Sequence, residues 1–278
     1  MRIQLLLALL SAGTALAPAG SSCPAPAEAS RAVVRPQQSR DDGKETPKQR
    51  AAKEKAALEK LNEGLRSKEA NVRQAALVDA AEAPYPEVIK AFGKVLDDRS
   101  DDVAMIAAEL LGRMEEEQAL DTLRRFATRR KKVLAKDPGL QEEVLRAIGR
   151  HRSPKSTSLL IKGAFEEENS QVRRARVFAV ANLRTTDAAK AIFSEMKKSD
   201  VKRLRGRLAN VRPALIYLTG TDAGQDPARW LQWWESNRRT FEVPEQPPKL
   251  SGDYANQWAR FWGDEMTYER RKKRSDRG

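Results

Sequence analysis

The sequence contains almost no cysteine or histidine. Among its 278 residues there is one Cys and one His. A single cysteine excludes an intrachain disulfide framework and a cysteine-rich zinc site, and a single histidine excludes a histidine-rich metal centre. A glycine-rich phosphate loop and a His-Glu-x-x-His motif are also absent from the sequence. We therefore expect no metal site and no cofactor.

Aromatic residues and long apolar runs are also scarce. Aromatics make up 6% of the chain, and beyond residue 30 no apolar run approaches the ~20 residues of a membrane span. The mature chain is therefore expected to have no transmembrane span. Charge is abundant instead: 33% of residues are charged, and 52 Lys and Arg face 39 Asp and Glu, for a net charge of +13. This balance is typical of a soluble, basic, helix-rich protein.

Residues 1–19 have the three-part pattern of a secretory signal peptide. Arg2 supplies the positive start, residues 3–10 form an apolar core, and a small-residue stretch ends in Ala17-Pro18-Ala19. The last three residues fit a cleavage site. The pattern predicts an exported protein, periplasmic or secreted.

Residues 20–46 are predicted to be a flexible tether, because they are rich in Pro, Ala, Ser and Gln and lack hydrophobic periodicity. Cys23 lies in this segment and offers an alternative to simple export. A cysteine that becomes the first residue after cleavage can carry a lipid anchor, although the preceding Gly20-Ser21-Ser22 is only a weak lipobox. Lipid anchoring through Cys23 therefore stays open, as does an uncleaved N-terminal anchor.

A helical array is predicted to begin at residue 47 and to extend to residue 220. Its start is marked by Thr46, Pro47 and Gln49, which have the spacing of a capping box with proline at the first helical position. Four later segments align on an aliphatic anchor, with gaps of 31, 37 and 32 residues. The anchors are Val72, Val103, Leu140 and Val172. Nine positions after each anchor stands a small residue: Ala81, Gly112, Gly149 and Ala181. A recurring pattern of this length indicates one helical unit stacked several times.

Each unit is interpreted as a pair of helices. The first helices are predicted near residues 69–82, 101–114, 138–150 and 169–184. The second helices are predicted near residues 86–97, 116–133, 153–166 and 186–198. The small residue late in each first helix allows neighbouring helices to approach closely. One pair cannot bury its own apolar stripe, so the pairs are expected to stack into an α-solenoid.

Two of the anchor segments carry a family resemblance. They read Asn71-Val72-Arg73-Gln74-Ala75-Ala76-Leu77 and Gln171-Val172-Arg173-Arg174-Ala175. These segments resemble HEAT-like repeats of the bacterial, bilin-lyase type, over roughly residues 55–220. The other two units lack the arginine, with Val103-Ala104 and Leu140-Gln141 in its place. The resemblance implies an all-α solenoid of a family whose members mostly bind other macromolecules, with a few enzymatic exceptions.

The C-terminal part is predicted to contain a Trp-rich capping helix and a basic tail. Within residues 221–243, the aromatic residues Trp230, Trp233, Trp234 and Phe241 have the spacing of one helical stripe. The stripe either covers the last repeat or docks another chain. Residues 244–278 comprise a proline spacer, an amphipathic segment and a basic tail. The tail ends in Arg270, Arg271, Lys272, Lys273 and Arg274.

Catalysis has little support in the sequence. The only histidine, His151, follows a predicted first helix and is interpreted as a C-terminal residue that interacts with the helix dipole. The runs of three glutamates at 115–117 and 166–168 are interpreted as solvated charge at helix junctions. We therefore expect that the protein is not an enzyme.

Basic clusters are the better functional lead. The strongest comprises Arg124, Arg125, Arg129, Arg130, Lys131 and Lys132, a run without an acidic residue. A second comprises Lys202, Arg203, Arg205, Arg207 and Arg212. Together with the tail, the first cluster is predicted to bind a protein or an anionic component of the cell envelope. A nucleic-acid-binding array and a bilin-lyase-like enzyme subunit are the alternatives, and export would remove the chain from cytoplasmic nucleic acid.

Overall fold

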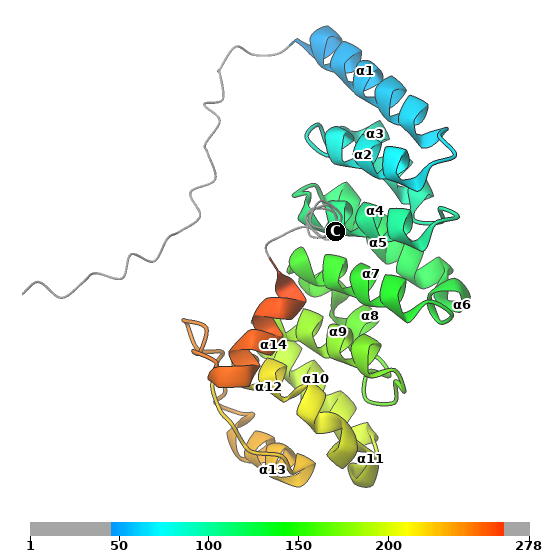
Figure 1. Cartoon of the computed structure of the whole chain (residues 1–278). Coiled ribbons are helices and arrows are strands. Elements are labelled where there is room, and N and C mark those ends of the chain that lie inside the picture. Colours follow the sequence, from blue (N-terminus) through cyan, green and yellow to red (C-terminus); the bar gives the residue numbers. More distant parts are fainter. Residues whose placement is uncertain (1–45, 264–278) are drawn as a thin grey trace, which may run out of the picture. The chain divides into compact units, whose positions relative to one another are not determined.

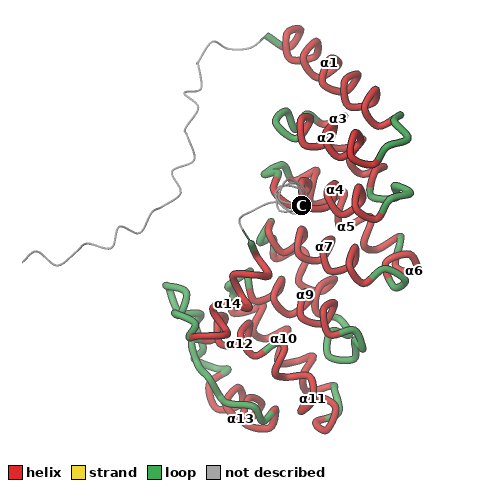
Figure 2. Tube along the Cα trace, in the orientation of Figure 1, coloured by secondary structure: helices red, strands yellow, loops and turns green. Residues whose placement is uncertain are grey.

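The helical pairs occur where the repeat pattern predicts them. The computed structural model describes residues 46–263, and within that range every regular element is a helix and none is a strand (Figure 2). The predicted all-α repeat architecture is thereby confirmed. The first helices are α2 (Ala70–Ala80), α4 (Asp101–Arg113), α7 (Pro138–Arg150) and α9 (Ser170–Ala181). The second helices are α3 (Pro86–Val95), α5 (Glu117–Arg129), α8 (Thr157–Ile161) and α10 (Thr186–Lys198).

The pairs stack so that first helices contact first helices. Helix α2 packs on α4, α4 on α7, and α7 on α9, and these four lie one after another in Figure 1. The second helices form the other layer, where α3 packs on α5 and α8 packs on α10. Helix α1 (Pro47–Leu65) packs against both members of the first pair. Its start has the predicted capping box: the Thr46 side chain accepts from the Gln49 N–H, and the Gln49 side chain accepts from the Thr46 N–H.

Small residues set the distance between first helices. A Cβ placed on Gly112 of α4 would lie 2.6 Å from the Cα of Ala147 in α7. A Cβ placed on Gly149 would lie 2.9 Å from the Cα of Ala179 in α9. Real Cβ atoms do not approach backbone atoms this closely, so both contacts require glycine. The small positions that the sequence pattern singled out therefore lie at helix–helix contacts in the second and third pairs.

The aliphatic anchors are buried in three of the four pairs. Val103, Leu140 and Val172 are at most 3% exposed, whereas Val72 is 40% exposed. The expectation that all four positions are equivalent is therefore wrong for the first pair. Val72 lies in the first turn of α2, which has the single helix α1 before it instead of another pair.

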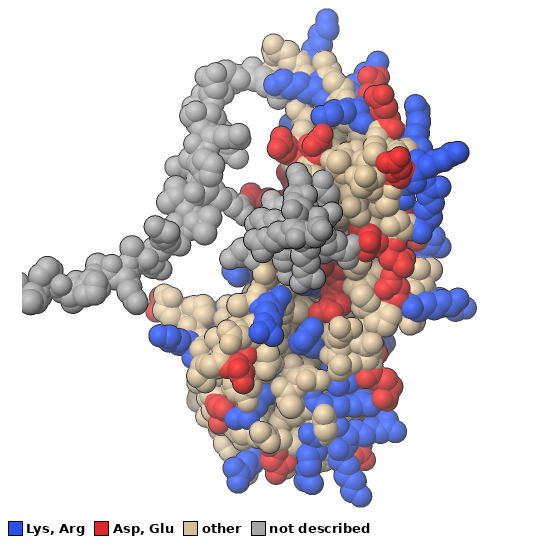
Figure 3. Space-filling view, viewed as in Figure 1, with Lys and Arg blue, Asp and Glu red and all other residues tan. Residues whose placement is uncertain are grey.

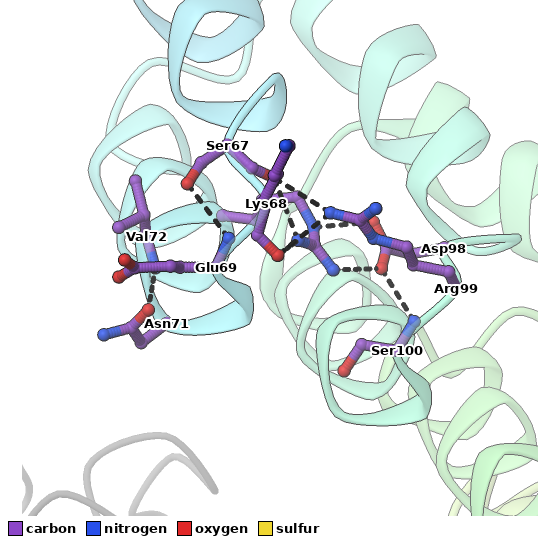
Figure 4. A network of polar contacts seen from close by, with 9 residues as sticks. Ser67, Lys68, Glu69, Asn71, Val72, Asp98, Arg99 and Ser100 are labelled. Carbon is purple, nitrogen blue, oxygen red and sulfur yellow. Dashed lines mark hydrogen bonds and ion pairs between the residues drawn. The ribbon is translucent and has the colours of Figure 1, made fainter.

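The arginine after the anchor has a structural role. Arg73 is buried, and its guanidinium donates to both carboxylate oxygens of Asp98 and to the carbonyls of Ser67 and Lys68 (Figure 4). Arg173 is also buried, and it donates to the two carbonyls at the same offsets, Glu167 and Glu168. The arginine thus satisfies loop carbonyls before the first helix of its own pair. This explains a polar residue at a buried position of the repeat.

Two second helices differ from the sequence prediction. Helix α8 follows a short 3-10 turn (Pro154–Ser156) and ends at Ile161, although a helix was expected to residue 166. Gly163 ends it by adopting a left-handed conformation with φ 72°. The helix expected near 116–133 is interrupted at Arg130, after which the short α6 (Lys131–Leu134) begins.

The Trp-rich helix is the second member of a terminal pair. Helix α12 (Arg212–Thr219) packs on α9, and α13 (Pro227–Asn237) packs on α10 and on α11 (Val201–Arg207). Trp230 is fully buried and Trp234 is 5% exposed, and the Trp234 ring stacks on Phe193 of α10 with centroids 4.7 Å apart. Phe241 lies beyond the end of α13, so it is not on the helical stripe. Its ring nevertheless contacts Trp234 at 5.6 Å.

Helix α14 (Gly252–Trp262) folds back onto the first helices. Trp258 stacks on Tyr217 of α12 with ring centroids 4.0 Å apart, and Phe261 contacts Phe178 of α9 at 5.0 Å. Two arginines of α7 donate to its last carbonyls: Arg146 to Phe261 and Arg150 to Trp262, both at 3.1 Å. The sequence alone did not decide whether the amphipathic segment packs on the array or binds a partner. In the structure it covers α7, α9 and α12.

The glycine contacts predict a specific overpacking effect. Gly149→Leu should lower the free energy of unfolding by ~1–3 kcal/mol, because its side chain must displace Ala179 or the Trp262 ring. Gly206→Ala is the matched control, since a Cβ there meets no atom within 4 Å, and the change should be neutral or stabilising. Urea unfolding of both variants measures the difference. Equal stability of the two would contradict the close contact.

The burial of the tryptophans predicts unequal costs along α13. Trp230→Ala should lower the free energy of unfolding by ~3–5 kcal/mol, because it empties a fully buried site against Phe193. Trp233→Ala should cost clearly less, because Trp233 is partly exposed. Thermal unfolding of the two variants in parallel tests this order. Similar losses of stability in the two variants would contradict the difference in burial between Trp230 and Trp233.

Candidate functional site: a basic groove between second helices

A groove lies between the second helices of the first and second pairs. It has a volume of about 740 Å³ and is lined by one face of α3 and one face of α5. Its basic lining residues are Lys90, Lys94, Arg125, Arg129 and Arg130, and its acidic ones are Asp97, Glu117 and Asp121. The aromatic ring of Phe126 also lines it. The groove is therefore open, net positive and partly apolar.

The charges of the groove are only partly paired. Arg130 donates to both carboxylate oxygens of Asp97, at 2.7 to 3.0 Å, and these bonds raise the pKa of its guanidinium. Lys90 pairs with Glu87 in the same helix. Lys94, Arg125 and Arg129 form no ion pair with any residue between 46 and 263. These three cations are available to an anionic ligand.

The predicted cluster at residues 124–132 is divided by the fold. Arg125, Arg129 and Arg130 line the groove. Arg124 points elsewhere: it pairs with Asp121 at 3.3 Å and donates to the carbonyl of Lys155. Lys131 and Lys132 lie in α6, beyond the break at Arg130, and are exposed. The expectation that this run has no acidic partners is wrong, because Asp97 of the neighbouring pair forms an ion pair with Arg130.

Two basic residues of the groove were missed by the sequence interpretation. Lys90 and Lys94 are one helical turn apart on α3 and face α5 across the groove. Lys94 and Arg125 are separated by 31 residues, which is also the separation of the first two anchors. A search for basic residues one repeat apart would therefore have found this pair.

The second basic cluster is largely neutralised. Arg203 pairs with Glu166, Arg207 with Glu168, and Arg212 with Asp222. Two of the three acids belong to the glutamate run at 166–168, which was expected to be solvated charge. Figure 3 shows the same mixture: basic side chains along the right-hand edge of the view, with acidic side chains between them.

Two other predicted sites lie outside the described residues. They are Cys23, with its alternative lipid anchor, and the tail residues Arg270, Arg271, Lys272, Lys273 and Arg274. The signal peptide and tether at residues 1–45 lie outside as well.

The single histidine is engaged with a neighbouring helix. His151 caps the C-terminus of α7, and its Nε2 lies 3.0 Å from the carbonyl oxygen of Leu111 near the end of α4. The interaction is therefore with the preceding first helix as well as with its own helix end. Burial lowers the pKa of His151 below its ordinary value of 6.5, and the Leu111 carbonyl opposes this shift.

Residues 46–263 contain neither a group of metal ligands nor a helix suited to crossing a membrane. Between residues 46 and 263, no three His, Cys, Asp or Glu side chains are grouped so that they could hold a metal ion. Across the same residues, none of the helices combines the length and the apolar character needed to cross a membrane.

Comparison with known families agrees with the architecture. Residues 58–135, from the second half of α1 to the end of α6, match the family model of HEAT repeats. The chain therefore contains a HEAT repeat region, which covers part of the predicted span of 55–220. HEAT repeat domains are typically protein-binding scaffolds. No curated protein matches the chain.

The environment of His151 predicts a pH dependence of stability. Because the folded-state pKa lies below 6.5, the unfolded chain takes up the proton first. The free energy of unfolding should therefore be insensitive to His151 well above pH 6.5 and should fall as the pH drops through 6.5 and below. His151 is the only histidine, and the carboxylates with lowered pKa titrate below 4.5. Urea unfolding at several pH values measures the slope. The same slope in His151→Gln would contradict the assignment.

Proposed function

We propose that this protein is a non-enzymatic scaffold of the cell envelope that binds an acidic segment of a partner protein in the α3–α5 groove. The observation that carries the proposal is a set of three cations, Lys94, Arg125 and Arg129, which form no ion pair among the described residues and lie in a groove formed by a HEAT repeat region. Positive side chains around a partly apolar floor favour a ligand that offers both carboxylates and apolar side chains.

Two further observations support a binding role. The groove lies between second helices, and α3 and α10 each border a further groove: one lies between α1 and α3, and another lies between α10 and α13. Grooves at several places along the stack support a binding role, because stacked pairs form the extended binding surfaces of solenoid proteins. The imidazole of His151, the only one in the chain, lies within hydrogen-bond distance of the Leu111 carbonyl, which supports a structural role for this side chain.

The envelope location rests on the sequence of residues 1–19. Export to the periplasm or the medium, with lipid anchoring through Cys23 as the alternative, would place the groove among acidic proteins, lipid headgroups and acidic polysaccharides. The tail residues 270–274 add five positive charges to the chain and would extend the reach of the same interaction. Fractionation of cells that express the full chain tests the location directly.

The groove predicts salt-dependent binding of an acidic peptide. The triple change Lys94→Gln, Arg125→Gln and Arg129→Gln should weaken binding of a labelled glutamate-rich peptide about tenfold, at roughly 0.5 kcal/mol for each partly exposed charge pair. Binding by the unchanged protein should weaken steeply above ~0.15 M salt, where the Debye length is about 8 Å. Fluorescence anisotropy measures both effects.

A second triple variant controls for the loss of net charge. Lys202→Gln, Arg205→Gln and Lys249→Gln removes three exposed cations that are unpaired among the described residues and lie outside the groove. It should bind the peptide as the unchanged protein does. Equal weakening of peptide binding by both variants would mean that the net charge of the protein, and not the groove, determines the affinity. Tighter binding of duplex DNA than of the peptide would favour the nucleic-acid alternative instead.

A further inference from the structure

A second cavity lies where the regular stack is interrupted. Helix α8 has 5 residues, whereas the other second helices have between 10 and 13. In the preceding pair, the second helix α5 ends at Arg129, and the short α6 begins directly after Arg130. Beside the short α8, the space between α5, α6, α7, α8 and α9 is partly unfilled. It forms a cavity of about 530 Å³, which is within the range of small-molecule sites.

The walls of this cavity are apolar and its charges have one sign. Most of its surface comes from aliphatic side chains of four helices: Ala127, Leu134, Val144, Leu145 and Leu159. Its charged lining residues are Lys131, Lys162 and Arg176, and no Asp or Glu lines it. This differs from the α3–α5 groove, where acids and bases alternate. A ligand that complements the cavity therefore has an apolar body and a negative group.

Arg176 is the most buried of the three cations. Its side chain is 19% exposed, and its Nη1 donates to the carbonyls of Leu159 and Leu160. Its Nε is buried without a hydrogen-bond acceptor among the described residues, and its ion pair with the carboxylate of Glu167 is long, at 4.0 Å. Burial lowers the pKa of this guanidinium. A buried cation without a full set of acceptors is costly, so an anion that reaches it gains a strong interaction.

From these features we infer that the cavity binds an apolar chain that ends in a carboxylate, with the chain against Val144, Leu145 and Leu159 and the carboxylate at Arg176. Guanidinium is the side chain best matched to a planar carboxylate, and a single Arg in an apolar cavity selects a ligand with one charged end. A free fatty acid and the C-terminus of a peptide with an apolar last residue both have this chemistry. This site is separate from the α3–α5 groove and does not depend on the function proposed for it.

Calorimetric titration of the full chain with four probes tests the inference. The probes are dodecanoate, dodecan-1-ol, and a short leucine-rich peptide with either a free or an amidated C-terminus. We expect binding of dodecanoate, of the free peptide, or of both, and no binding of the alcohol or the amide. Which of the two carboxylates binds identifies the source of the ligand. Binding of neither carboxylate, or equal binding of the neutral probes, would overturn the inference.

Two variants locate the site. Arg176→Gln should weaken binding about ten- to a hundredfold, as expected when a hydrogen bond to a charged group is lost. Because this change also removes the bonds to the carbonyls of Leu159 and Leu160, Ser158→Trp provides a second test: Ser158 is exposed at the cavity, and the indole should fill it without removing a charge. Unchanged binding by a folded Ser158→Trp variant would also overturn the site.

Reciprocal measurements separate this site from the groove. The variant with Lys94, Arg125 and Arg129 changed should keep its binding of the carboxylate probe, and Ser158→Trp should keep its binding of the glutamate-rich peptide. Loss of the carboxylate probe in the groove variant would assign its binding to the groove and overturn the cavity site. Failure of the glutamate-rich peptide to bind any variant would count against the groove alone.

Discussion

The close approach of first helices at small residues is the constraint on which the rest of the structure depends. Gly112 against Ala147, and Gly149 against Ala179, bring α4, α7 and α9 together at backbone distance. Larger side chains at these positions would separate the first layer, and the second helices would separate with it. The cavity beside α8, which lies among the pairs that these contacts join, therefore depends on packing in the other layer.

The repeat architecture was predictable because its causes are local. Anchors, small residues and proline at helix starts each act within a few residues, so the bounds of α2, α4, α7 and α10 agree with prediction. The early end of α8 was missed, although Gly163 marks it, because a single glycine does not reveal its φ. The position of α14 was not predictable from spacing, since the contact between Trp262 and Gly149 joins residues far apart in the chain.

The candidate site was predictable in composition but not in arrangement. The run at 124–132 does contain three groove residues, yet the break at Arg130 sends Lys131 towards the second cavity and leaves Lys132 exposed. Asp97 neutralises Arg130 from the preceding pair. Counting charges along the sequence misses an acidic partner that another repeat supplies. In the structure, burial and ion pairing distinguish the cations with a structural role from those that are available to a ligand.

Helix α14 changes the order in which this array can be completed. In a simple solenoid each pair is finished once its neighbour has formed, so assembly can follow synthesis from the N-terminus. Here the carbonyls of Phe261 and Trp262 accept bonds from Arg146 and Arg150, more than a hundred residues earlier. The middle pairs keep an uncovered aromatic surface around Phe178 until the last helix arrives. A truncation before residue 252 would leave that surface permanently exposed, and an exposed aromatic surface of this kind favours aggregation.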